Sequence, residues 1–262
     1  MENIRRPAVA GMFYPDDPRQ LHDQIQTLLT AVAPVKAPVP KAVIAPHAGY
    51  VYSGPVAASV YARLAPARDT IRRVVLLGPA HRVGFRGLAV SGMQAFATPL
   101  GEVPIDRKAV ESLLGLAEVG FLEQAHAFEH SLEVHLPFLQ EVLGEFQLVP
   151  LVVGEAAPET VGRVLETLWG GPETLIVISS DLSHYHDYDT ARQLDSTTSR
   201  AILELDFGSI GYDNACGRNP IGGLLWLAKR RGLSGELVDL RNSGDTAGPR
   251  DHVVGYGAYA FG

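Results

Sequence analysis

The sequence predicts an α/β protein with a central, largely parallel β-sheet flanked by helices. Apolar runs of three to six residues recur along the chain, and each is typical of a buried strand. Segments with helical spacing of apolar residues alternate with these runs, which is the pattern of strand–helix units in a parallel sheet. The 262 residues contain no internal repeat and no extended linker, so we expect one domain spanning residues 1–262.

The elements follow in order along the chain. Leu21, Ile25 and Leu28 share one face of the first expected helix, and a proline-rich connector at 33–41 follows it. Further on, Asn219 and Pro220 are suited to the cap and first position of a helix. We expect helices at 17–29, 55–64, 107–114, 131–143, 158–168, 188–205 and 220–231. We expect strands at 42–45, 74–77, 88–90, 148–153 and 175–178, and a late strand or hairpin at 253–261.

Composition excludes several classes of protein. The net charge of −7 disfavours a nucleic-acid partner, which would need a basic face. The single cysteine rules out an intrachain disulfide and fits a reducing, cytoplasmic location. No apolar segment resembles a signal peptide within residues 1–14, and no run of 18 apolar residues occurs, so we expect no membrane partner.

Three histidines each lie a few residues beyond an apolar strand. They are His47, His81 and His184. Ligands of open α/β sheets bind at the carboxyl ends of the strands, where the loops converge, so these imidazoles are expected to meet. A single histidine in such a loop is more often a packing residue, but three in the same position favour a functional site. Imidazole serves there as a metal ligand or as an acid or base.

Two further groups are candidates for the same site. Asp181 follows the strand that precedes His184, where it either orients an imidazole and moves protons or closes an Asx-type turn. Cys216 precedes a helix start and lies two residues before Arg218, which would lower the pKa of the thiol. The alternative for Cys216 is a small buried apolar residue.

The segment from Glu129 to Pro137 resembles a metal motif at first sight. It lacks the His-Glu-x-x-His spacing, because His130 and His135 are five residues apart and point to different faces of a helix. At helical spacing, Glu129 and Glu133 share a face. We expect the segment to form the wall of the site, with direct ligation left open.

Six motifs together resemble the Memo family. They are Arg6-Pro7-Ala8-Val9-Ala10-Gly11-Met12-Phe13-Tyr14-Pro15, Ala45-Pro46-His47-Ala48-Gly49-Tyr50, Leu77-Gly78-Pro79-Ala80-His81, Glu129-His130-Ser131-Leu132-Glu133-Val134-His135-Leu136-Pro137, Ser179-Ser180-Asp181-Leu182-Ser183-His184 and Cys216-Gly217-Arg218-Asn219-Pro220-Ile221-Gly222. The resemblance implies a fold similar to class III extradiol dioxygenases. It also implies a metal set of His47, His81 and Cys216 for iron or copper, with Asp181 and His184 in the same pocket.

The sequence departs from two patterns that the resemblance brings with it. Extradiol dioxygenases are expected to hold iron through two histidines and a carboxylate, whereas here a thiolate would replace the carboxylate, which argues against ring cleavage. An animal member binds phosphotyrosine peptides with a tryptophan near the N-terminal motif, but this chain has Met12 and Phe13 there. Peptide recognition is therefore not carried over.

Three functions are consistent with the sequence. The first is a metal-dependent oxidoreductase with His47, His81 and Cys216 as ligands and the pair His184 and Asp181 as acid and base. The second is a binding module that holds an anionic or phosphorylated small molecule or peptide through Arg218 and a helix N-terminus. The third is a hydrolase with Cys216 as nucleophile and His184 as base.

Overall fold

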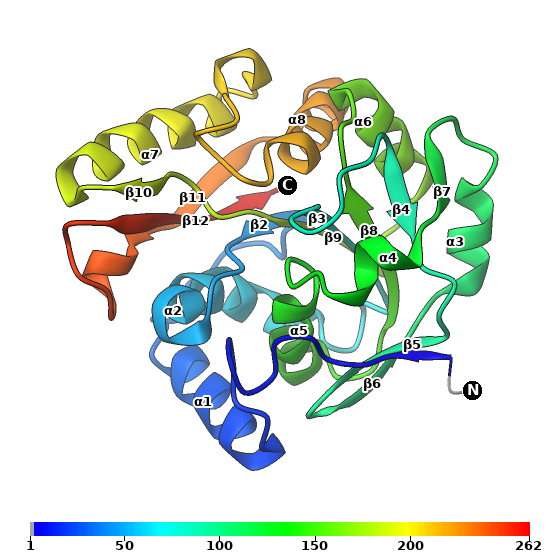
Figure 1. Ribbon diagram of the computed structural model, residues 1–262, viewed down its shortest axis with the longest axis horizontal. Coiled ribbons are helices and arrows are strands. Elements are labelled where there is room, and N and C mark those ends of the chain that lie inside the picture. Colours follow the sequence, from blue (N-terminus) through cyan, green and yellow to red (C-terminus); the bar gives the residue numbers. More distant parts are fainter. Residues whose placement is uncertain (1–2) are drawn as a thin grey trace.

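A nine-stranded mixed sheet runs through the computed structural model, which describes residues 3–262 (Figure 1). Its four central strands lie side by side in parallel, in the order β2 (Ala42–Ala45), β9 (Thr174–Ser179), β3 (Arg73–Pro79) and β8 (Gln147–Val153). The predicted α/β class is therefore confirmed, and the parallel strands form the centre of the sheet.

Antiparallel strands extend the sheet on both sides of this centre. On one side β12 (Val253–Phe261) pairs with β2, and β10 (His184–His186) and β11 (Gly235–Asn242) pair with β12. On the other side β4 (Leu88–Val90) is antiparallel to β8, and β7 (Val119–Phe121) is the outermost strand. The sheet is thus parallel at its centre, where strands buried on both faces are expected, and again in the outer pair of β4 and β7.

Helices cover both faces of the sheet. One group packs together on one side: α1 (Pro18–Thr30), α2 (Tyr50–Tyr61) and α5 (Leu136–Leu143). The opposite side carries α6 (Pro158–Thr167), α7 (Tyr188–Leu203) and α8 (Arg218–Arg231) (Figure 1). The short helices α3 (Arg107–Leu113) and α4 (Glu123–Ala127) lie near the β4–β7 edge. No helix among residues 3–262 has the length and apolar character that a membrane crossing requires.

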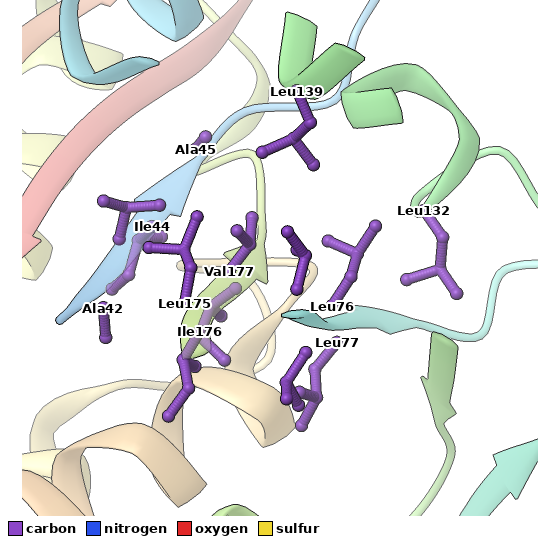
Figure 2. Close-up of a cluster of buried hydrophobic side chains, with 14 of the residues drawn as sticks. Ala42, Ile44, Ala45, Leu76, Leu77, Leu132, Leu139, Leu175, Ile176 and Val177 are labelled. Atoms are coloured by element: carbon purple, nitrogen blue, oxygen red, sulfur yellow. The ribbon is translucent and has the colours of Figure 1, made fainter. Parts of the chain in front are cut away.

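The central strands form the core because almost every side chain on them is apolar. Ile44, Leu76 and Ile176 are completely buried, and Figure 2 shows them packed between the two helical layers with Leu132 and Leu139. Full burial of each such side chain stabilises the fold by roughly 1.5–3 kcal/mol. This core fixes the strands whose carboxyl ends carry the site.

The N-terminal segment is attached to the domain by a buried ion pair. Its strand β1 (Ile4–Arg5) joins β5 (Ala95–Thr98) and β6 (Gly101–Pro104) in a small second sheet. The guanidinium of Arg5 donates to the carboxylate of Glu133, and both side chains are buried. Glu133 also accepts hydrogen bonds from the backbone N–H groups of Ala8 and Val9 and from the hydroxyl of Tyr14.

Three helix starts differ by two residues or more from those that the sequence predicts. Helix α2 begins at Tyr50 rather than at residue 55, because burial of Tyr50 outweighs the cost of an interior Pro55. The expected helix at 131–143 is a turn, a 3-10 helix at Glu133–His135 and then α5, because the carboxylates of Glu129 and Glu133 accept hydrogen bonds from the backbone N–H groups of His81 and Val9. Asn219 does not cap α8, which starts at Arg218.

Candidate metal centre

The site begins where the central parallel strands end. His47, His81 and Asp181 each lie two residues beyond the last residue of β2, β3 and β9. Since β9 pairs with both β2 and β3, these three residues leave the sheet at one edge. The structure therefore brings together residues that are more than 130 positions apart in sequence, such as His47 and Asp181. The backbone N–H of His47 donates to Oδ1 of Asp181 at 2.8 Å.

Cys216 reaches the same point from the loop before α8. Its backbone N–H donates to the carbonyl of Asp181 at 3.3 Å, and its Sγ accepts from the N–H of Asp181 at 3.3 Å. Its Sγ is 3.4 Å from Nε2 of His47. One ligand atom each from His47, His81 and Cys216 lies within 4.8 Å of the other two, which is compatible with a shared ion.

Hydrogen bonds fix which imidazole nitrogen each of the two histidines presents. The hydroxyl of Ser179 donates its only proton to the carbonyl of Ser131 at 2.6 Å, so it accepts from Nδ1–H of His47, also at 2.6 Å. Nδ1 of His81 is 2.9 Å from a carboxylate oxygen of Glu129 and donates to it. In their neutral forms, His47 and His81 therefore both keep Nε2 as the nitrogen with a free lone pair, which is how metal-binding histidines are usually oriented.

Glu129 anchors one wall of the site. Its carboxylate accepts from the backbone N–H groups of His81, His130 and Ser131 at 2.6, 2.9 and 2.9 Å. Burial opposes ionisation, but the charge and hydrogen bonds of His81 and the backbone N–H groups lower the pKa of Glu129 to about 2. An ionised Glu129 holds the ring of His81 in place.

His130 completes the wall as a third imidazole. Its ring stacks on that of His81 with 4.7 Å between centroids, and it lies 5.4 Å from His47 and 4.9 Å from the ring of Phe13. Burial lowers its pKa to about 4, so it is neutral. Ligand atoms of His81, Glu129 and His130 also lie within 4.8 Å of one another.

Asp181 and His184 lie beside this cluster. Burial raises the pKa of Asp181 to about 7, against the backbone N–H of His47 that stabilises the carboxylate. Nδ1–H of His184 donates to the carbonyl of Leu182 at 2.8 Å, which leaves Nε2 unengaged. Asp181, His184 and His130 line a cavity of about 400 Å³.

Comparison with known proteins shows the family to which the chain belongs. The family model described as Memo-like protein matches residues 5–260. The chain belongs to the Memo-like family. A MEMO1 family protein of Aquifex aeolicus is 40% identical over 97% of both chains. Relatives with the same family description are 36% identical in Sulfolobus acidocaldarius, over 99% of both chains, and 38% identical in Methanosarcina barkeri, over 97% of this chain and 98% of the relative.

The environment of Cys216 in this family member differs from the expected one. Burial, together with the negative charge of Asp181, raises the pKa of the thiol instead of lowering it. Arg218 does not approach the thiol as an anion-binding group, because its Nε–H donates to the carbonyl of Ile210. Its guanidinium also lies 4.3 and 4.6 Å from the ring centroids of Phe207 and Tyr212. The expected low pKa of the thiol is therefore wrong because Cys216 is buried beside Asp181, and Arg218 does not offset this because its guanidinium is turned toward a neighbouring loop.

The segment from Glu129 to His135 divides into separate roles. Glu129 and Glu133 do not share a face, since one carboxylate holds His81 and the other holds the N-terminal segment. His135 is buried away from the candidate ligands and hydrogen-bonds through Nδ1 with the hydroxyl of Tyr61 at 2.7 Å. Sequence reasoning missed Ser179 as the partner of His47; its place at the end of β9, opposite Ala45, was the available signal.

Proposed function

We propose that this protein is a metal-dependent oxidoreductase in which His47, His81 and Cys216 hold iron or copper. The main support is the orientation of the two histidines. Nδ1 of each is hydrogen-bonded to another residue, which leaves Nε2 with a free lone pair, and Nε2 of His47 lies beside the thiol of Cys216. Packing alone does not require two buried imidazoles to be oriented in the same sense toward a cysteine.

The distances between donor atoms support a shared ion. At metal–nitrogen and metal–sulfur lengths of about 2.0 and 2.3 Å, neighbouring ligands of a tetrahedral ion are roughly 3.3–3.8 Å apart. Nε2 of His47 and Sγ of Cys216 are 3.4 Å apart. The full set lies within 4.8 Å, so only shifts of an ångström or less are needed to close it around an ion.

The donor set favours a transition metal that accepts sulfur. Thiolate with two imidazoles suits copper, iron or zinc better than magnesium or calcium. Iron or copper bound here would supply one-electron and oxygen chemistry. A nearby divalent charge would also favour the thiolate of Cys216, which burial alone disfavours.

Asp181 and His184 are suited to proton handling beside such a centre. Asp181, with a pKa of about 7, exchanges protons near neutral pH. His184 lines the cavity, and Nε2 is the nitrogen that it has left for a ligand. We assign these two residues the acid and base roles for a substrate in the cavity.

The two alternative functions have weaker support. Arg218 is not placed to bind an anion, because its guanidinium donates to the carbonyl of Ile210 and packs against two aromatic rings. A cysteine hydrolase with His184 as base lacks the required pair, since the imidazole within hydrogen-bonding reach of Sγ is that of His47. We therefore retain the oxidoreductase.

Metal content tests the proposal directly. The protein would be purified without oxygen, reconstituted separately with ferrous, cuprous and zinc ions, desalted and measured by mass spectrometry of the metals. Wild type is expected to retain about one iron or copper per chain, whereas Cys216→Ser and His81→Ala lose most of it, because each removes one of three ligands. Oxygen uptake by the loaded wild type with a reductant would test the redox part.

His22→Ala is the matched control. His22 is exposed on α1 and pairs with Glu141, far from the candidate ligands, so metal content should not change. Equal and negligible metal in wild type, the two ligand variants and the control would end the metal proposal. Bound metal without oxygen uptake would leave a metal site and remove the oxidoreductase.

A further inference from the structure

Strand β11 forms an open edge of the nine-stranded sheet. Among residues 3–262 it pairs with β12 alone, and the helices α2 and α7 pack against it (Figure 1). An edge strand presents a row of backbone N–H and C=O groups that another strand can pair with. With eight residues, Gly235–Asn242, this edge is long for a strand of a globular protein. It is therefore a candidate interaction surface.

The hydrogen bonds of β12 show which of its residues face β11. Beside the end of the strand, Ser234 and Gly262 donate to each other's carbonyls at 3.1 and 3.2 Å. In an antiparallel pair every second residue points its backbone groups at the same neighbour, so the even-numbered residues of β12 face β11. The odd-numbered residues face the other way: the carbonyls of Phe261 and Gly255 accept from N–H groups just before β2 and β10. This alternation holds along the whole of β12.

A bulge sets the spacing of the residues at the open edge of β11. The register with β12 skips Val238. Leu237 lies before the bulge, opposite Tyr259. Leu240 lies after it, opposite Gly257, so both leucines direct their backbone N–H and C=O groups away from β12 and toward the open edge. A regular strand directs every second residue to one edge, whereas these two leucines are three residues apart. A regular strand therefore cannot pair with both of them.

A second copy of β11 has the matching spacing. When two copies run antiparallel about a two-fold axis, Leu237 of each copy lies opposite Leu240 of the other, and the two can exchange backbone hydrogen bonds. Opposite residues share a face of the sheet, and the hydroxyl of Tyr259 lies 2.7 Å from Oγ of Ser199 on α7, so both leucines lie on the α7 face. An axis perpendicular to the sheet keeps this face on one side in both copies. The leucine side chains therefore meet, and Leu237, which is 36% exposed, gains an apolar neighbour.

The charges on the opposite face are complementary in the same register. Glu236 and Arg241 each adjoin one of the two leucines and so lie on the α2 face, and the pairing that joins the leucines places Glu236 of one copy opposite Arg241 of the other. Their side chains are 58% and 42% exposed. Within one copy, Glu236 binds Arg63 and Arg241 binds Asp239. Two copies would join these ion pairs into one network, with no like charges directly opposite each other.

We propose that this protein forms a homodimer through β11, with the sheets of two copies joined edge to edge about a two-fold axis. Leu237 then pairs with Leu240, and Glu236 with Arg241, each across the two copies. The bulge at Val238 makes this edge selective, because it excludes a regular strand and fits a second strand with the same bulge. The inference goes beyond the proposed function, since it uses no residue of the candidate metal centre.

Cysteine cross-linking tests the register of the interface. Leu237→Cys and Leu240→Cys would be made separately in a Cys216→Ser background, so that each chain carries a single cysteine. In the proposed pairing the Cα atoms of positions 237 and 240 are about 5.5 Å apart across the two copies, which is within disulfide range. Equivalent positions of the two copies are roughly 10 Å apart. Mild oxidation should therefore link a mixture of the two variants and neither variant alone. Equal linking of one variant alone, or no linking in the mixture, would refute the register.

Sedimentation velocity tests the dimer itself. Wild type should be mainly dimeric at about 100 μM, as expected for a Kd in the micromolar range. Leu237→Pro should raise the Kd at least about tenfold, because proline removes an N–H at the open edge and leaves the pairing of β11 with β12 in place. A Tm close to that of wild type would show that this variant is folded. Wild type that stays monomeric at this concentration would overturn the proposal.

Charge reversal tests the contact between Glu236 and Arg241. Arg241→Glu places two acidic side chains opposite each other and should raise the Kd at least about fivefold, since the dimer contains this contact twice. Glu236→Arg combined with Arg241→Glu exchanges the charges and should restore most of the affinity. Arg163→Glu is the control, because it breaks an exposed ion pair with Glu159 on α6. A dimer that none of these variants weakens, or that the control weakens equally, would show that β11 is not the interface.

Discussion

Replacing Glu133 with glutamine should loosen the N-terminal segment from the rest of the domain. Glu133 is fully buried and accepts from four donors: the guanidinium of Arg5, the N–H groups of Ala8 and Val9, and the hydroxyl of Tyr14. Glutamine offers one acceptor oxygen and turns an N–H₂ group toward donors. It also leaves Arg5, which is only 4% exposed, without a counter-charge.

Removing one partner of a buried ion pair lowers the free energy of unfolding by about 3–5 kcal/mol. For a chain of this length, 4 kcal/mol corresponds to a fall in Tm of roughly 8 °C. Differential scanning calorimetry would measure it, with limited proteolysis to detect release of the segment. Glu159→Gln, which breaks an exposed pair with Arg163, should change Tm by about 1 °C or less. A Glu133→Gln Tm within 2 °C of wild type, with no new cleavage, would refute the reasoning.

Three further predictions concern Asp195, His184 and Gly217. Burial raises the pKa of Asp195 to about 6, so ionisation of this carboxyl group destabilises the fold as pH rises from about 4 to about 6. Asp195→Asn should therefore raise the free energy of unfolding by up to about 3 kcal/mol at pH 8 and by little at pH 4. Urea unfolding measures this difference, and equal gains at both pH values would contradict the prediction. His184→Gln should keep the metal content of wild type while abolishing oxygen uptake with a bound substrate, and loss of metal would instead make it a ligand. Gly217→Ala should lower the free energy of unfolding by about 1–3 kcal/mol and also lower the metal content. A Cβ at this position would lie 2.4 Å from the carbonyl oxygen of Ser179 and would displace Cys216. Unchanged Tm and metal content would show that the loop accommodates the added methyl group.

The sequence predicts the central sheet well because its strands are buried on both faces. Residues 42–45 and 88–90 are strands with the expected bounds, and the other three expected apolar runs lie inside β3, β8 and β9. The sequence did not predict β1, β5, β6, β7 and β10, which have only two to four residues each and too few positions for a periodic pattern. Their pairing depends on distant segments such as Ile4–Arg5. The sequence also did not predict β11, whose eight residues mix polar and apolar side chains and form no apolar run.

The site was predictable only in part. The rule that loops meet at the carboxyl ends of parallel strands placed His47, His81 and His184 at one edge. In the structure His47, His81 and Asp181 follow the ends of β2, β3 and β9, whereas His184 is the first residue of β10. The direction of side chains was not predictable, as Arg218 shows: a residue two positions from Cys216 turns to Phe207 and Tyr212 because those rings lie beside it in the fold. The hydrogen bond from His81 to Glu129 was equally hidden, since 48 positions separate them.

The wide spacing of His47 and Cys216 has a consequence for biosynthesis. The two residues are 169 positions apart, and the last strand, β12, pairs beside β2. At 5–20 residues per second, a ribosome adds Cys216 roughly 8–34 s after His47. The growing chain therefore carries His47 and His81 for many seconds without the third side chain or the closing strand. A site that uses all three side chains would therefore be complete only after Cys216 has been added, and the strand that closes the sheet beside β2 is added later still.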